Sequence, residues 1–139
     1  MVVTDSIEVQ TRQGMDVKEI TEAVAGAVRD SGVRNGTVTV FVPGATGALS
    51  TVEYEPGLVK DLREFFDRVI PRDLQYHHEQ RWHDENGHSH VRATLLGPSL
   101  VVPFTDGKLL LGTWQQIIFI DFDVPARQRR MVVQVMGEA

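Results

Sequence analysis

Polar and apolar residues alternate along several short segments of the chain, a pattern typical of strands that bury one face. Residues 6–11 alternate in this way, with Ile7 and Val9 on the apolar side. Residues 37–42 are rich in β-branched side chains, which favour a central strand, and residues 48–54 form a shorter run. The pattern predicts three strands in the N-terminal part of the chain.

Two other segments repeat their apolar residues at helical spacing. Asp16 and Glu19 predict the start of the first helix, and Gly32 predicts its end. Its apolar positions are Val17, Ile20, Val24, Ala27 and Val28. The second helix is predicted to begin at Pro56, because proline suits the first turn, and to end before Pro71. Its apolar positions are Leu58, Leu62, Phe65, Phe66 and Val69.

The C-terminal half is predicted to consist mainly of antiparallel strands. Four are expected there, at residues 99–104, 108–111, 115–122 and 131–136. Asp106 and Gly107 lie between the first two and favour a tight hairpin turn. The order of elements predicts an α+β fold with one domain over residues 1–139, in which two helices pack on a mainly antiparallel β-sandwich.

Composition and charge exclude several classes of protein and of functional site. The 139 residues are 42% hydrophobic and 24% charged, which describes one soluble domain with a core. No apolar run approaches the roughly 18 residues of a membrane span, and the N-terminus lacks a signal peptide pattern, so we expect a cytoplasmic protein without a membrane partner. The net charge of −5 argues against nucleic-acid binding but leaves room for a small anion held by a few local cations. The absence of cysteine excludes disulfides, thiolate metal sites and cysteine nucleophiles.

All five histidines of the chain lie between Tyr76 and Ser99, and this segment is the candidate active site. In an extended segment His88 and His90 would point to the same face and reach one ion or phosphate, whereas on a helix they would splay apart. His78 lies far enough upstream to return from another element. Three imidazole nitrogens and a carboxylate would suit zinc or another divalent ion.

The alternative is a polar loop of solvated histidines, and we expect His77 and His83 to be solvated. Arg92 is the best candidate for a phosphate contact, because it follows His90 in the same segment. Ser99, after Gly97 and Pro98, offers either a hydroxyl for an anion or a tight turn. Three further arginines are expected at a solvated or subunit-facing edge, namely Arg127, Arg129 and Arg130.

Five separated segments also match a known pattern in chain order: Gly36–Pro43, Tyr76–His78, Asn86–Ser99, Leu111–Gln116 and Gly137–Glu138. Together they resemble the YjbQ-like family of secondary thiamine-phosphate synthase enzymes. The resemblance implies a strand-rich α+β fold that assembles as a homotrimer around a small polar site with histidines. It also implies a weak transferase activity that joins a thiazole phosphate to a pyrimidine diphosphate with loss of pyrophosphate.

Residue roles follow from the resemblance and the patterns together. Catalytic roles are expected for His78, His90, Glu53 and Gln115, and contacts to a small phosphorylated substrate for Arg92, Ser99 and Glu55. A divalent metal, zinc or magnesium, is expected on His78, His88 and His90.

One position departs from the family pattern. Many members carry a histidine directly after the Val-Pro pair, where this chain has Gly44, and Glu53 and Glu55 are the available substitutes. The alternative function is a trimer that binds a small anion or a metal ion with the same residues but without turnover.

Overall fold

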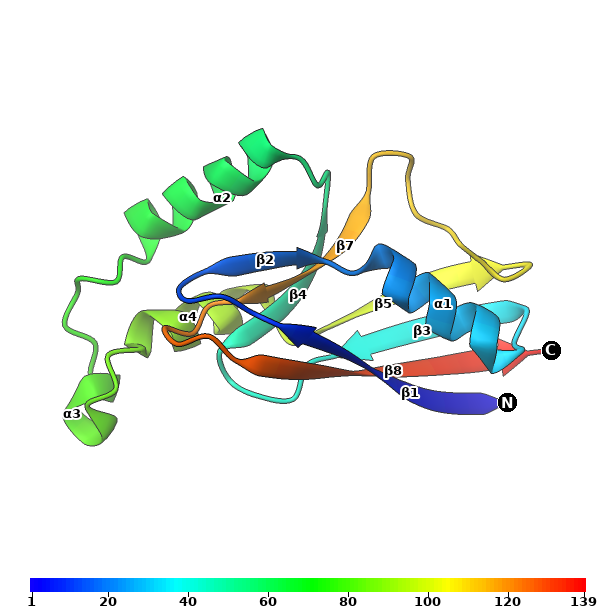
Figure 1. Cartoon of the computed structure of the whole chain (residues 1–139), viewed down its shortest axis with the longest axis horizontal. Coiled ribbons are helices and arrows are strands. Elements are labelled where there is room, and N and C mark those ends of the chain that lie inside the picture. The colour runs from blue at the N-terminus through cyan, green and yellow to red at the C-terminus, as the bar shows by residue number, and fades with distance from the viewer.

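The computed structural model describes the backbone of residues 1–139 and every side chain except that of Trp82. In this part of the chain, eight strands form two antiparallel sheets (Figure 1). The larger sheet has the order β1 (Val2–Gln10), β8 (Gln128–Glu138), β3 (Asn35–Phe41), β5 (Ser99–Thr105) and β6 (Lys108–Leu109). The smaller sheet has the order β2 (Asp16–Glu19), β7 (Gln116–Asp121) and β4 (Gly47–Val52). The predicted strand-rich α+β fold is confirmed.

Four helices accompany the sheets: α1 (Thr21–Ser31), α2 (Pro56–Val69), α3 (His78–Trp82) and α4 (Gly87–Leu96). The prediction that the second helix begins at Pro56 is confirmed, and so is the hairpin around Asp106 and Gly107. The helices α3 and α4 were not predicted, and both lie within the histidine segment.

The predicted start of the first helix at Asp16 is wrong, because residues 16–19 form β2. This strand pairs antiparallel with β7, so that Asp16 lies opposite Asp121 and Glu19 opposite Ile118. The helix begins only at Thr21, whose hydroxyl accepts a hydrogen bond of 2.8 Å from the Ile117 backbone N–H. Pairing with a strand distant in sequence therefore overrides the local helical spacing.

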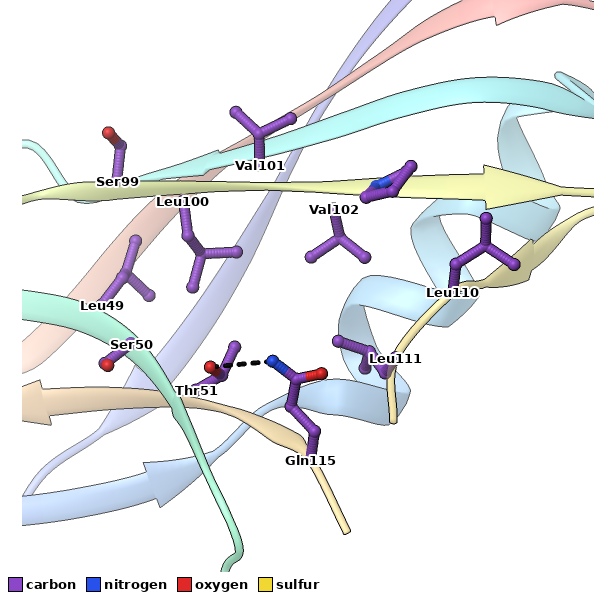
Figure 2. Close-up of a pocket in the computed structure, with 11 residues that line it drawn as sticks. Leu49, Ser50, Thr51, Ser99, Leu100, Val101, Val102, Leu110, Leu111 and Gln115 are labelled. Carbon is purple, nitrogen blue, oxygen red and sulfur yellow. Dashed lines mark hydrogen bonds between the residues drawn. The ribbon is translucent and has the colours of Figure 1, made fainter. Parts of the chain in front are cut away.

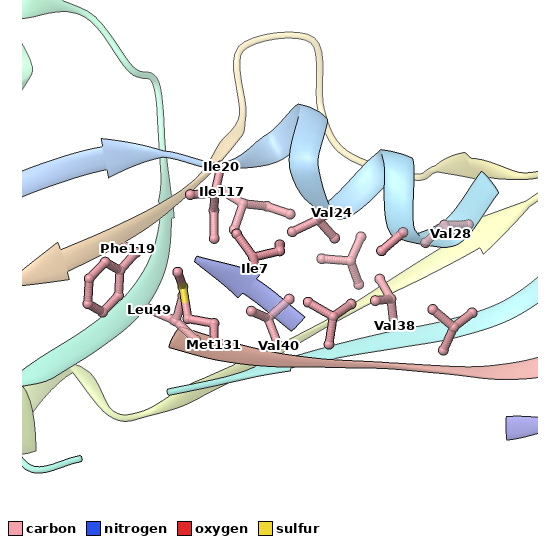
Figure 3. Close-up of a cluster of buried hydrophobic side chains, with 14 of the residues drawn as sticks. Ile7, Ile20, Val24, Val28, Val38, Val40, Leu49, Ile117, Phe119 and Met131 are labelled. Atoms are coloured by element: carbon pink, nitrogen blue, oxygen red, sulfur yellow. The ribbon is translucent and has the colours of Figure 1, made fainter. Parts of the chain in front are cut away.

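Two apolar clusters form the core, and β7 separates them. Ile117 and Phe119 point to the first cluster, which lies between α1 and the larger sheet (Figure 3). Ile118 and Ile120 point to the second cluster, which includes Phe66 of α2 and residues of α4. Successive side chains of a strand point to opposite faces, so β7 reads as a continuous apolar run because both its faces are buried.

The helix α4 is fixed beside the end of β7. The Ser89 hydroxyl donates a hydrogen bond of 2.5 Å to the carbonyl of Phe122, and the Asn86 amide donates one of 3.2 Å to Asp123. Ala93 packs into the second apolar cluster. These contacts hold one face of α4 against the end of β7. Among the described residues, no helix is long and apolar enough to cross a membrane.

Candidate functional site

The part of the histidine segment that carries His88 and His90 is helical. An extended conformation would have been needed for these two side chains to reach one ligand. His88 and His90 both lie in the first turn of α4. At about 100° per residue, two residues apart on a helix point about 200° apart around its axis. The expectation that His88 and His90 face one ligand is therefore wrong, and the two side chains belong to different surroundings.

His90 lies against His78 of α3. The centroids of the two imidazole rings are 4.3 Å apart, and the rings are tilted by 45°. The Nε2 atom of His78 lies 3.2 Å from Oδ1 of Asp84, but it forms no hydrogen bond with any group that the structure describes. The fold thus brings together two of the predicted site residues, twelve positions apart in the chain, and adds an acidic neighbour.

The surroundings of His90 favour its neutral form. Burial lowers the pKa of His90, and the nearby His78 lowers it further. The carboxylates of Asp84, Asp123 and Glu79 act in the opposite direction but do not cancel the effect. A neutral imidazole has one N–H donor and one acceptor nitrogen, so His90 can donate one hydrogen bond and accept another.

A cavity of about 290 Å³ opens beside His90. It is lined by Gly44, Ala45, Gly47, His90, Ala93, Thr94, Gly97 and Pro98. His90 and Thr94 are four residues apart and share one face of α4. Gly44, the position that departs from the family pattern, lies in the same cavity as His90, and its φ of +132° suits glycine.

A buried carboxylate, Asp123, supports this region. Burial alone would raise its pKa, but hydrogen bonds from Asn86, from the Val124 backbone N–H and from Arg127 hold the pKa of Asp123 below its usual value. The donor distances are 3.2, 2.8 and 2.7 Å in that order. Asp123 therefore stays charged and ties the start of α4 to the segment after β7.

A second buried pair holds the loop that carries Gly44. Arg129 donates to both carboxylate oxygens of Asp121, at 2.9 and 2.8 Å, and to the Thr46 hydroxyl at 2.6 Å. Arg129 was expected at a solvated or subunit-facing edge, and the solvated alternative is wrong, because its side chain is largely buried in this pair. Sequence reasoning missed Asp121 and Asp123, although two aspartates flanking Phe122 at the end of an apolar strand are an unusual pattern.

His88 and Arg92 lie together on another face of α4, four residues apart. Tyr76 is the aromatic neighbour of His88, with a centroid distance of 6.4 Å. The Arg92 side chain donates to the carbonyl of Ile70 at 3.0 Å and lies 3.3 Å from Asp67. The sequence led us to expect Arg92 beside His90. Instead, Arg92 lines a separate cavity together with His88.

Ser99 and Gln115 line a third cavity, of about 390 Å³, between β4 and β5 (Figure 2). The Gln115 amide donates to the Thr51 hydroxyl at 3.1 Å, and its oxygen accepts from the Gly112 backbone N–H at 3.0 Å. Figure 2 shows that leucine and valine side chains make up most of this wall. Neither Ser99 nor Gln115 lines the cavity of His90.

Glu53 and Glu55 lie at the far end of β4 from Gly47. At about 3.3 Å per residue, Glu53 is roughly 20 Å along the chain from Gly47, and neither glutamate lines the cavity of His90. Glu55 caps α2, because its carboxylate accepts hydrogen bonds from the backbone N–H groups of Gly57 and Leu58. These glutamates do not replace the histidine that is missing at Gly44.

The divalent ion expected from the sequence needs at least three side chains that converge. Among the side chains that the structure describes, no group of three or more histidine, aspartate or glutamate residues is placed to hold a metal ion. His88 faces the cavity of Arg92, and His78 and His90 make only a pair. The residues present do not fit the predicted three-histidine metal site.

Comparisons of sequence and of structure with known proteins all point to one family. The family model described as "UPF0047 protein YjbQ-like" matches residues 5–138. A UPF0047 protein of Archaeoglobus fulgidus is 40% identical over 130 residues, which cover 94% of this chain and 98% of that protein. A UPF0047 protein of Methanothermobacter thermautotrophicus is 38% identical over 137 residues, which cover 99% and 94%. The fold is similar to the crystal structure of a YbjQ-like protein of unknown function from Sulfolobus solfataricus, with a TM-score of 0.94, 34% identity and 99% of both chains covered.

Proposed function

Because the chain belongs to the UPF0047 YjbQ-like family, we propose that it joins a thiazole phosphate to a pyrimidine diphosphate with loss of pyrophosphate, as a secondary thiamine-phosphate synthase does. The observation that carries this proposal is His90, which lines a cavity of about 290 Å³ and whose ring lies 4.3 Å from that of His78. A cavity of that size has room for a small heterocycle. A cytoplasmic location is part of the proposal.

The reaction needs stabilisation of a leaving group more than it needs a nucleophile on the protein. The thiazole nitrogen forms a bond to the methylene carbon of the pyrimidine, while the bond from that carbon to the diphosphate oxygen breaks. The departing pyrophosphate keeps the bonding electrons, so negative charge grows on its oxygen. Groups that donate hydrogen bonds to this oxygen lower the barrier.

In the proposed mechanism, His90 supplies such a donor. Its lowered pKa leaves a neutral ring whose N–H can face the leaving oxygen. His78 lies beside it and offers a second ring nitrogen that is not engaged in a hydrogen bond with the described residues. The two rings therefore place imidazole nitrogens side by side, where a donor to an anionic leaving group is needed.

The test is an assay for thiamine phosphate with purified protein. We expect slow turnover by the wild type and its loss in His78→Ala and in His90→Ala. His77→Ala is the matched control, because His77 is an exposed histidine one position from His78. Circular dichroism on each variant separates loss of chemistry from loss of fold. Turnover that survives both substitutions would remove the histidine pair from the mechanism.

A second variant separates an enzyme from a binding protein. Gly44 lies in the cavity of His90 at the position where many relatives have histidine. If the wild type shows no turnover and Gly44→His gains it, the chain keeps the fold as a small-anion binding protein, which is the alternative function. If the wild type turns over and Gly44→His changes the rate, the enzyme function stands and Gly44 tunes it.

The proposal includes a homotrimer. It is supported by large apolar side chains that remain exposed on and after β5, namely Val101, Leu110 and Trp114. Val101 and Leu110 also line the cavity between β4 and β5. Exposed apolar patches of this kind commonly mark interfaces between proteins.

A further inference from the structure

A cavity of about 200 Å³ on the other side of α4 gathers positive charge. Its charged and imidazole residues are Arg63, Asp67, Arg72, His88 and Arg92. Three guanidinium groups thus face one carboxylate. They come from α2, from the segment after it and from α4, so folding and not sequence proximity brings them together.

The guanidinium of Arg92 is buried in this cavity, and its positive charge is only weakly neutralised by its acidic neighbour. The Arg92 side chain is only 4% exposed, whereas the side chain of its acidic neighbour, Asp67, is 75% exposed at a distance of 3.3 Å. A solvated carboxylate at that distance neutralises a buried guanidinium poorly. The Arg92 head is held in place by the carbonyl of Ile70 and by the face of the Phe66 ring, 5.7 Å away.

The other two arginines keep free donors. Arg63 uses one nitrogen for the carbonyl of Met15, at 2.6 Å. Arg72 forms no hydrogen bond or ion pair with any residue that the structure describes. A guanidinium carries five N–H donors in a planar fork that matches the oxygens of phosphate.

His88 provides the second, independent indication. It is 5% exposed and lines the same cavity, yet its Nδ1 atom has no hydrogen-bond partner among the described groups. Burial lowers the pKa of His88, and the charges of Arg92 and Arg72 lower it further. A buried polar nitrogen without a partner is costly, and a bound oxygen atom would satisfy it.

We infer that this cavity binds a small oxyanion, phosphate or the head of a phosphomonoester, through Arg63, Arg72, Arg92 and His88. The site is separate from the His78–His90 pair, because His88 and Arg92 share one face of α4 while His90 and Thr94 share another. Its volume of about 200 Å³ accommodates a single phosphoryl group. Three guanidinium groups select the anion, and the neutral imidazole adds a directed hydrogen bond.

Isothermal titration with inorganic phosphate, at constant ionic strength, tests the inference. We expect binding by the wild type and a rise in Kd of about tenfold or more in Arg72→Gln and in Arg63→Gln, since each loses a charge-assisted hydrogen bond. Arg68→Gln is the matched control, because Arg68 is on α2 but does not line the cavity. The control is expected to bind as the wild type does.

A histidine NMR spectrum and one further variant separate this site from the proposed reaction. Phosphate should shift the ring nitrogens of His88 and leave those of His77 unchanged. His90→Ala should retain phosphate binding even if it abolishes turnover. No binding by the wild type, equal loss in Arg68→Gln, or loss in His90→Ala with retention in Arg72→Gln would each overturn the inference.

Discussion

At the scale of single residues, the surroundings of His90 and His88 determine their protonation. Burial lowers the pKa of both, helped by His78 at His90 and by Arg92 at His88. We predict that both rings titrate below the ordinary value of 6.5 in the folded protein. A pH titration followed by NMR of the imidazole groups measures this directly, and a midpoint at or above 6.5 for His90 would contradict it.

The sign of the effect on stability follows from the same shifts. The unfolded chain takes up protons on these rings at a higher pH than the folded chain does. Their contribution is therefore present above the unfolded pKa and is lost as the pH falls below it. Urea unfolding at pH 7.5 and at pH 5.5 should give a lower midpoint at the acidic pH.

The buried pair of Asp121 and Arg129 is a further prediction at this scale. Asp121 is fully buried and accepts two hydrogen bonds from Arg129. Asp121→Ala leaves a largely buried guanidinium without its carboxylate, so we expect a loss of about 3–5 kcal/mol in the free energy of unfolding. Denaturant unfolding measures it, with Asp5→Ala at an exposed position as the control. A change within about 0.5 kcal/mol would show that the pair contributes little.

At the scale of elements, two nearby glutamates differ in their role at the start of α2. Both side chains are exposed, but Glu55 accepts hydrogen bonds from two backbone N–H groups at the start of the helix, whereas Glu53 lies two residues before the cap. We predict that Glu55→Ala lowers the free energy of unfolding by about 1 kcal/mol. Glu53→Ala, the matched control, should change it by less than about 0.5 kcal/mol. Equal effects in denaturant unfolding would contradict the capping role.

The sequence pattern predicts the long helices and strands because the residues of each element themselves show its typical spacing or composition. The helix α2 shows Pro56 at its start and apolar residues at helical spacing, and β3 is rich in β-branched residues. The helix α4 carries no such signal, since it opens with Gly87-His88-Ser89-His90 and no side chain caps it. It is held by tertiary contacts, such as the hydrogen bond from Ser89 to Phe122, which no local pattern reveals.

The sequence indicated candidate residues for the site but not how they are arranged. The clustering of histidines drew attention to His78 and His90, and the structure places these two side by side. The sequence does not show that the other candidates belong to different cavities. Because residues 87–96 are helical, His88 and Arg92 line one cavity and His90 lines another. Three-dimensional pairs such as Asp121 with Arg129 follow from strand ends meeting across the smaller sheet and the larger one.

At the scale of the whole molecule, we predict a homotrimer with a mass three times the 15.6 kDa of one chain. Burial of Val101 and Leu110 between copies would remove exposed apolar surface, so Val101→Asp with Leu110→Asp should shift the assembly to monomers. Leu74→Asp is the control, because Leu74 is an equally exposed apolar residue on another part of the chain. Light scattering after size exclusion gives the mass, and a wild-type monomer at micromolar concentration would contradict the trimer.

The measurement that tests the central claim most directly is the rate of thiamine phosphate formation by His90→Ala relative to the wild type, with both proteins shown to be folded. Loss of one positioned hydrogen-bond donor to a developing oxyanion costs a factor of about 100 or more in rate. We predict a fall of at least that size in His90→Ala, while His77→Ala keeps the wild-type rate. Equal rates in the wild type and His90→Ala would contradict the assignment of the His78–His90 pair as the reacting site.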